Sequence, residues 1–308
     1  SAVPALMKAR RSVKIGVIVP LAGDGESGNA VRYAQTRAFA LQAEAAGVDS
    51  VWIFDHLLYR FPEQPTQGTW EAWTVLAGLA EATARVELGT LVICTPFRNP
   101  AVLAKMAVTL DEVSGGRLIL GLGAGWHQPE FDAFGIPFDH RVDRLEEALQ
   151  IIVPLLRQGH ISFQGSHYRA VDCEILPRGP RPAGPPLLIA AKGARMLRLT
   201  ARYADSWNTA WLGQVDALAE RRAPLEEACA QEGRDPATLE VTVGVNVDYT
   251  PSVGAGKALA GTPEQIAAGL RGYAAVGVGH VICNLQPTTA DSLSRFAEAL
   301  AAYQRMSS

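Results

Sequence analysis

Short runs of apolar residues recur along the chain, each ended by a proline, a glycine or a polar pair. The first, KIGVIVP at residues 14–20, is rich in β-branched residues and stays apolar after its opening lysine. A strand covered on both faces has no solvent-facing side to mark with polar residues, so such a run predicts a buried parallel strand. Comparable segments occupy residues 50–54, 86–94, 118–123, 187–191, 205–209, 239–249 and 281–285.

Helical spacing of apolar residues fills the intervals between these strands. In residues 29–46 small and apolar side chains recur every three or four positions, and Gly47 is placed to end that helix in a left-handed conformation. Pro100 stands where proline is favoured, in the first turn of a helix. The other expected helices cover residues 71–84, 100–113, 142–157, 194–203, 263–275 and 290–304, with one more running through residue 229.

Eight strand–helix pairs in one chain of 308 residues predict an α/β fold, a (β/α)8 TIM-like barrel, as a single domain over residues 13–308. An open, doubly wound sheet is the competing arrangement. Residues 159–186 break the rhythm, because GHISFQGSHYRAV has the pattern of a hairpin and LPRGPRPAGPP that of a proline-rich connection. We therefore expect an insertion after the fourth strand–helix unit. In a barrel, functional groups gather where the strands end.

Charge and composition limit what the protein acts on. A formal net charge of −3 gives no basic surface of the kind that nucleic acid or anionic lipid requires, which favours a small-molecule substrate. No apolar run reaches the roughly 18 residues that span a membrane, and the first residues lack a secretory signal pattern. We expect a soluble, cytoplasmic protein. The four cysteines form no paired motif, so neither disulfides nor a metal site is expected, and Cys94 is interpreted as a buried structural thiol.

The sequence GLGAG at residues 121–125 is the first candidate for a cofactor loop. It fails as a dinucleotide fingerprint, because Trp126 stands where the third glycine is needed. Small residues at a strand end nevertheless let the backbone approach a flat ring, so we expect Gly123, Ala124 and Gly125 to bind a cofactor. A tight strand-to-loop turn with no ligand is the alternative.

A second loop of small residues, AAKGARM at residues 190–196, precedes an expected helix. Free backbone N–H groups at a helix start can hold a phosphate, and we expect that site at Gly193, Ala194, Arg195 and Met196. Arginines recur at helical spacing beside it. Their interpretation is open between extra charge for the ligand and a solvated basic face: Arg195, Arg198 and Arg202.

Candidate proton-handling side chains follow two of the predicted strands. Asp55 and His56 end the second strand and place an imidazole beside a carboxylate, and histidine exchanges protons near neutral pH. His127, just past the glycine loop, is the second candidate. Large aromatic residues fall in the loops of the same face. We expect Trp126 and Trp207 to line an apolar substrate pocket.

Several longer segments together resemble the bacterial luciferase-like monooxygenase superfamily, and within it the branch of F420-dependent oxidoreductases. They are DSVWIFDH, ELGTLVICTPFRNPAVLAKMAVTLDEVSGGRLILGLGAGWHQPEFDAFGIPF, RLEEALQII, FQGSHYRAV and AAKGARMLRLTARYADSWN. They span most of residues 13–209, and the long middle segment is the most specific. The carboxyl-terminal third matches only in general pattern.

This resemblance implies a barrel that binds FMN or the deazaflavin F420 at its C-terminal mouth. It implies a cis peptide bond between Leu91 and Val92, in a bulge that backs the cofactor ring. Asp55 and His56 match the family's aspartate–histidine pair near the reactive face. Sugar-phosphate dehydrogenases of this group carry a glutamate after the glycine loop. Trp126 in its place speaks against a sugar-phosphate substrate.

The leading expectation is hydride transfer between F420 and a small, apolar organic substrate, with His56 moving the accompanying proton. The arginines favour F420, whose oligoglutamate tail benefits from cations outside the phosphate site, and FMN is the alternative cofactor. A two-component monooxygenase that receives reduced FMN from a separate reductase is the second hypothesis. A non-catalytic flavin-binding protein is the third. Relatives of this kind often form homodimers.

Overall fold

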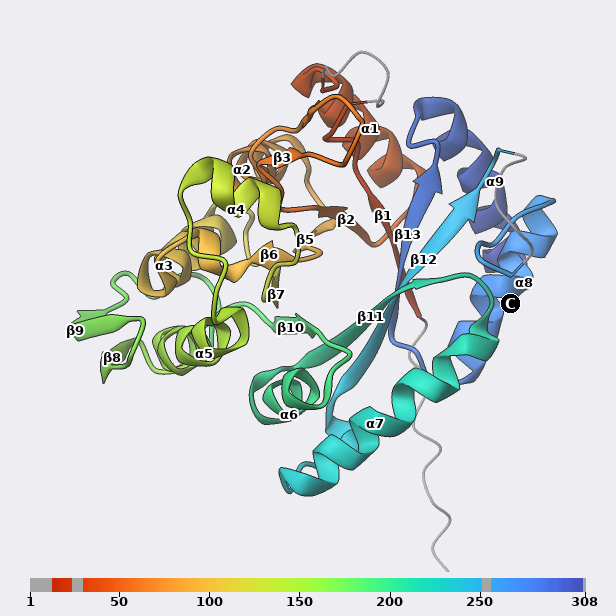
Figure 1. Cartoon of the computed structure of the whole chain (residues 1–308). Helices are drawn as coiled ribbons and strands as arrows, with labels where there is room; N and C mark the ends of the chain where they lie inside the picture. Colours follow the sequence, from red (N-terminus) through yellow and green to blue (C-terminus); the bar gives the residue numbers. More distant parts are fainter. Residues whose placement is uncertain (1–12, 24–29, 251–255, 307–308) are drawn as a thin grey trace, which may run out of the picture.

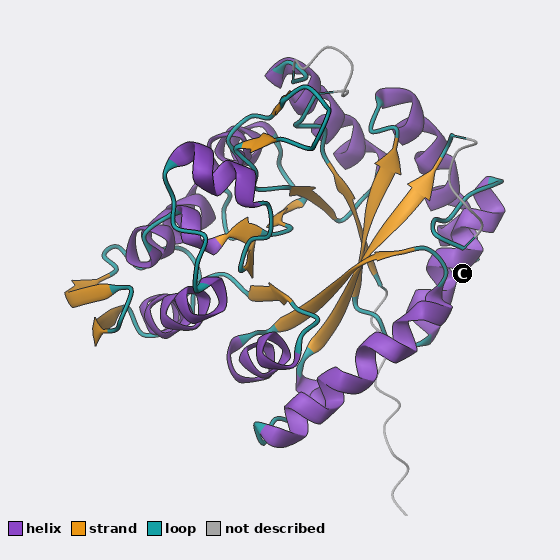
Figure 2. Cartoon of the chain, in the orientation of Figure 1, coloured by secondary structure: helices purple, strands orange, loops and turns teal. Residues whose placement is uncertain are grey.

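A computed structural model of the chain describes residues 13–23, 30–250 and 256–306, and the expected helix start at residue 29 lies outside them. Within these residues, eight parallel strands close into a barrel surrounded by helices (Figures 1 and 2). The strands are β1 Lys14–Ile18, β2 Ser50–Ile53, β5 Glu87–Thr90, β7 Leu118–Gly123, β10 Leu187–Ala190, β11 Ser206–Leu212, β12 Glu240–Asp248 and β13 His280–Gln286. Pairing of β7 with β10 and of β1 with β13 completes the closure, so the predicted (β/α)8 barrel is confirmed.

The helices begin and end at local signals that the sequence carries. Helix α1 ends at Gly47, whose φ of +91° is the left-handed conformation expected there. Helix α8 begins at Thr262, whose side chain forms a capping box with Gln265. The helices outside the barrel are α1 Tyr33–Ala46, α2 Ala72–Ala82, α3 Pro100–Val113, α5 Arg141–Arg157, α6 Ala194–Tyr203, α7 Leu218–Gln231, α8 Pro263–Ala275 and α9 Ala290–Arg305. None of the described helices is long and apolar enough to cross a membrane.

Apolar side chains fill the inside of the barrel below its mouth. Trp52 is fully buried there and packs with the inward side chains of neighbouring strands. Its indole occupies the space that a side chain at Gly16 would need, since a Cβ on that glycine would lie 2.6 Å from Trp52 Nε1. A second and larger core lies between the strands and the helices. The interior of the barrel is therefore packed with side chains below the mouth.

Four short strands outside the barrel pair into two antiparallel hairpins. Strands β8 His160–Gln164 and β9 Arg169–Glu174 form an antiparallel hairpin where the sequence predicts one, and Figure 1 shows it beside α5. A smaller hairpin of β3 Leu58–Tyr59 and β4 Gln67–Gly68 was not expected.

The third predicted strand, residues 86–94, is interrupted after β5 and resumes as β6 Ile93–Cys94. The peptide bond between Leu91 and Val92 in this gap is cis, as the resemblance implies. A second cis bond that no pattern predicts joins Ala210 and Trp211, and β11 continues past it to Leu212, beyond its expected end.

Candidate active site

A cavity of about 660 Å³ opens at the C-terminal ends of the barrel strands. Its walls come from the ends of β2, β7, β10 and β11 and from the β5–β6 interruption. Most of the predicted site residues meet here, although the sequence places them in five separate segments. The lining residues are 54–56, 59, 91–94, 123–126, 130, 190–192, 196 and 208–211.

One wall is the contact between the Leu91–Val92 bulge and the glycine loop. A Cβ on Gly123 would lie 2.6 Å from Val92 Cγ2, so the loop packs against the bulge only because it has no side chain there. Gly125 has a φ of +86°, and a Cβ on it would lie 2.7 Å from Cys94 Sγ. These glycines therefore hold the wall together in addition to leaving the cavity open.

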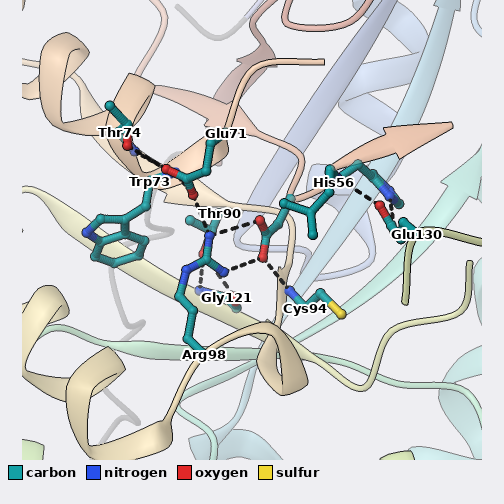
Figure 3. Close-up of polar contacts among 11 residues, drawn as sticks. His56, Glu71, Trp73, Thr74, Thr90, Cys94, Arg98, Gly121 and Glu130 are labelled. Atoms are coloured by element: carbon teal, nitrogen blue, oxygen red, sulfur yellow. Dashed lines mark hydrogen bonds and ion pairs between the residues drawn. The ribbon is translucent and has the colours of Figure 1, made fainter. Parts of the chain in front are cut away.

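His56 is held in the cavity by a buried carboxylate that sequence reasoning missed. Its Nδ1 lies 2.9 Å from Glu130 Oε1, and Glu130 Oε2 accepts the Leu57 N–H at 2.8 Å (Figure 3). Glu130 lies in α4 Gln128–Phe134, a short helix that follows the glycine loop. An ionised carboxylate only accepts hydrogen bonds, so beside an ionised Glu130 the Nδ1 of His56 donates, and in the neutral imidazole Nε2 carries the free lone pair.

The interpretation of Asp55 as the carboxylate partner of His56 is wrong. Asp55 is buried and accepts two hydrogen bonds from Arg98, at 2.7 and 3.1 Å, and one from the Cys94 N–H at 2.8 Å. Arg98 also donates to Glu71 at 2.6 Å (Figure 3). Burial alone lowers the pKa of Arg98, but its contacts with Asp55 and Glu71 raise it above its usual value. Asp55 thus fixes the backbone of β6 behind the bulge.

His127 and Trp207 lie outside the cavity wall that the sequence assigns to them. His127 is buried, and its Nε2 accepts the Arg60 N–H at 3.0 Å. Burial lowers the pKa of His127 more than the nearby Glu130 raises it. Trp207 is 1% exposed in the core between strands and helices, with Nε1 donating to Ala191 O at 2.9 Å. Trp211 lines the cavity instead.

Tyr59 and Cys94 line the same cavity as His56, and both keep their protons at neutral pH. The Tyr59 ring centroid lies 4.4 Å from that of His56, and Tyr59 lines the cavity although no sequence pattern singled it out. Cys94 also lines it. Burial, together with nearby carboxylates, raises the pKa of both groups. Tyr59 can therefore donate a hydrogen bond at neutral pH, and Cys94 is no thiolate nucleophile.

Trp126 forms the exposed rim of the cavity. Its side chain is 61% exposed, and its ring lies edge-on to that of His56, with centroids 5.6 Å apart. Lys192 is the one cationic side chain among the lining residues that the structure describes.

The predicted phosphate loop borders the cavity through residues 190–192 and Met196, and Gly193 is the N-cap residue of α6.

Acidic side chains already engage two of the three arginines of helix α6. Arg195 pairs with Asp143 and Glu146, each at 2.6 Å, and Arg202 bonds Glu232 through two nitrogens, at 2.9 and 3.0 Å.

Three side chains with metal-ligand atoms meet at the start of α5. One atom each of His140, Asp143 and His167 lies within 4.8 Å of the others. None of them lines the cavity. Because Arg195 already neutralises Asp143, this trio is an ion-paired group on the surface of the barrel.

A (β/α)8 barrel with a cavity at its C-terminal mouth and a carboxylate-held histidine in the wall has the architecture of a barrel enzyme. The chain belongs to the luciferase-like monooxygenase family, whose sequence profile matches residues 13–252.

Individual relatives differ in their chemistry. The chain is similar to the F420-dependent glucose-6-phosphate dehydrogenase of Kineococcus radiotolerans, 32% identical over 68% of this chain and 63% of that protein. It is also similar to the pyrimidine monooxygenase RutA of Escherichia coli O1:K1 / APEC, 32% identical over 73% of this chain and 62% of that one. The chain thus spans less than two thirds of either relative.

Among solved structures, an F420-dependent secondary alcohol dehydrogenase in complex with an F420-acetone adduct has a similar fold. Its TM-score is 0.78 at 20% identity, over 94% of this chain and 99% of that one.

Proposed function

We propose that this chain is an oxidoreductase that transfers hydride between F420, bound in the mouth cavity, and a small neutral organic substrate. The observation that carries the proposal is the position of His56, which Glu130 holds at the wall of a cavity backed by the Leu91–Val92 bulge. When bound, the cofactor supplies the hydride chemistry. The protein supplies binding, orientation and the proton.

The residues of the cavity fit a flavin-type cofactor. Its volume of about 660 Å³ is within the usual range for ligand sites. The glycine loop and the bulge would hold the flat ring, since they present backbone and small side chains. The N–H groups at the start of α6, beginning at Ala194, have no carbonyl partner inside the helix and would hold a phosphate, as expected from the sequence.

The chain's own groups have separate roles in this proposal. His56 would accept or donate the proton at Nε2, because Nδ1 is engaged by Glu130. Tyr59 would donate a hydrogen bond to a substrate oxygen. Trp126 would cover the substrate at the rim and replace the glutamate expected in sugar-phosphate dehydrogenases. Together with the single cation of the lining, this favours a neutral, apolar substrate.

Two observations support FMN-dependent monooxygenation as the second candidate. The arginines expected to favour the F420 tail are partly neutralised, since Arg195 and Arg202 pair with acidic residues. The similarity to a pyrimidine monooxygenase equals, in identity, the similarity to an F420-dependent dehydrogenase. We place F420 first because Lys192 in the wall and half-buried Arg198 on α6 add positive charge beside the phosphate loop.

The test is to titrate purified protein separately with FMN and F420, followed by turnover assays on a panel of neutral alcohols, ketones and activated alkenes. Preferential F420 binding with hydride transfer to a panel member supports the proposal. Binding of FMN alone, with oxygen-dependent turnover when a reductase is added, favours the second candidate. Cofactor binding without turnover of any kind indicates a flavin-binding protein.

His56→Ala is the matching variant, and His160→Ala, on the exposed hairpin, is its control. We expect the first to lower turnover strongly with little change in cofactor affinity, and the second to change neither. Arg198→Glu with Arg202→Glu should weaken F420 more than FMN. If the variant binds F420 and FMN equally more weakly, these arginines do not favour F420 over FMN.

A further inference from the structure

Asn208, on β11, carries a side-chain oxygen that lacks a hydrogen-bond partner. The residue is 1% exposed and lines the mouth cavity. Buried side-chain oxygens without a partner are uncommon in folded proteins, and one at a cavity wall points to a ligand group that completes it. The other orphaned side-chain atoms of the described chain belong to Thr95, Tyr249, Arg271 and Gln286, none of which lines this cavity.

Neighbouring hydrogen bonds fix which end of the Asn208 amide is the acceptor. The Thr242 hydroxyl lies 3.0 Å from the Trp207 carbonyl oxygen, which can only accept, so Thr242 uses its proton in that bond. The Thr242 oxygen is then left as an acceptor. The Asn208 amide atom 2.9 Å from it must therefore be the nitrogen, which donates. The Asn208 oxygen is left on the other side, without a donor.

The strand register gives the direction of this oxygen. Asn208 pairs with Thr242 of β12 on one side and with Ala190 of β10 on the other. Because the nitrogen reaches toward Thr242 of β12, the oxygen at the other end of the amide points away from β12. Asn208 thus carries a fixed acceptor in the lining of the cavity, with no freedom to turn into a donor.

We propose that Asn208 Oδ1 is the acceptor for the ring N3–H of the bound cofactor. This inference rests on the proposed function, and it holds for FMN and F420 alike, because both carry that N–H between two ring carbonyls. A buried acceptor that a ligand N–H completes also excludes a ligand without it, since the oxygen would stay unpaired. Asn208 would then set the position of the pyrimidine edge and select for rings that donate there.

The experiment compares the dissociation constants of FMN and N3-methyl FMN by fluorescence titration, with 5-deazariboflavin and its N3-methyl derivative as the deazaflavin pair. The wild-type protein should bind the N3–H form at least about tenfold more tightly than the methylated form. Asn208→Leu should bind the two forms within about threefold of each other. Asn246→Leu, the same change on β12 at a residue outside the cavity lining, should keep the wild-type ratio.

A second measurement needs no variant. The N3 proton of ¹⁵N-labelled FMN bound to the wild-type protein should give a slowly exchanging signal shifted downfield by the hydrogen bond. The inference is overturned if the wild-type protein binds both forms equally, or if Asn208→Leu is folded and keeps the wild-type ratio. Failure of FMN and of both deazaflavins to bind the wild-type protein would overturn the proposed function itself, which separates the two outcomes.

Discussion

Replacing Arg98 by methionine tests whether the buried ion pair secures the wall of the cavity. Methionine keeps much of the apolar stem but removes the guanidinium, so that Asp55, whose side chain is 0% exposed, keeps only the hydrogen bond from the Cys94 N–H among the described residues. Removing one partner of a buried pair costs about 3–5 kcal/mol, because the remaining charge is left uncompensated. We expect Arg98→Met to lower the free energy of unfolding by about 4 kcal/mol.

Arg202→Met is the matched control, because Arg202 also makes a two-nitrogen pair with a carboxylate but is 45% exposed. A surface pair of this kind contributes about 0–1 kcal/mol.

The measurement is urea and thermal unfolding followed by circular dichroism. With an unfolding entropy of about 2.1 cal/mol/K per residue, a loss of about 4 kcal/mol lowers the Tm of the 308-residue chain by about 6 °C, and the control by no more than about 2 °C. Equal shifts for the two variants, or a loss below about 1 kcal/mol for Arg98→Met, would refute this reasoning.

Three further predictions concern the cavity and the core. Glu130→Gln should reduce turnover of the cofactor-loaded enzyme about tenfold to a hundredfold, because a charge-assisted hydrogen bond to His56 is lost. The same change in a His56→Ala background should have no further effect, and an additive loss would contradict the coupling. Gly125→Ala should lower the free energy of unfolding in urea by about 1–3 kcal/mol, because its φ is +86° and the added Cβ meets Cys94. Gly135 also has a positive φ but has open space around it, so Gly135→Ala measures the cost of the backbone conformation without a steric clash. Burial, aided by the charge of Lys14, lowers the pKa of His280 to about 3 from 6.5, so the unfolded chain binds the extra proton below pH 6.5. As the pH falls from 6.5 to about 3, this histidine should therefore lower the free energy of unfolding by about 1.4 kcal/mol per pH unit. His280→Gln should reduce that slope.

The barrel was predictable because its signals are local. Helix α3 starts at Pro100, which favours a first turn, and both α3 and α6 have the bounds that were expected from the sequence. The strands were marked by uninterrupted apolar runs, which any strand covered on both faces needs. Helix α4 was missed because seven residues are too few to establish a helical period.

The location of the candidate site in the barrel was predictable from the sequence, but the orientation of its side chains was not. The rule that barrel function lies where strands end places Asp55, His56 and the glycine loop at one mouth, and all of them line one cavity there. Which tryptophan faces the cavity was not predictable, because the alternation that turns Trp207 outward needs the register of β11.

The sequence by itself determined the order of the strand–helix units, the glycines whose missing side chains let the bulge and the loop touch, and the family. Only the tertiary structure decided the hydrogen-bond partners, which are Arg98 for Asp55 and Glu130 for His56, and it alone showed that the Asn208 oxygen has none. These contacts join residues dozens of positions apart, and a hydrogen bond depends on where two atoms lie in space. That position is set by closure of the barrel, which brings the strand ends to one mouth.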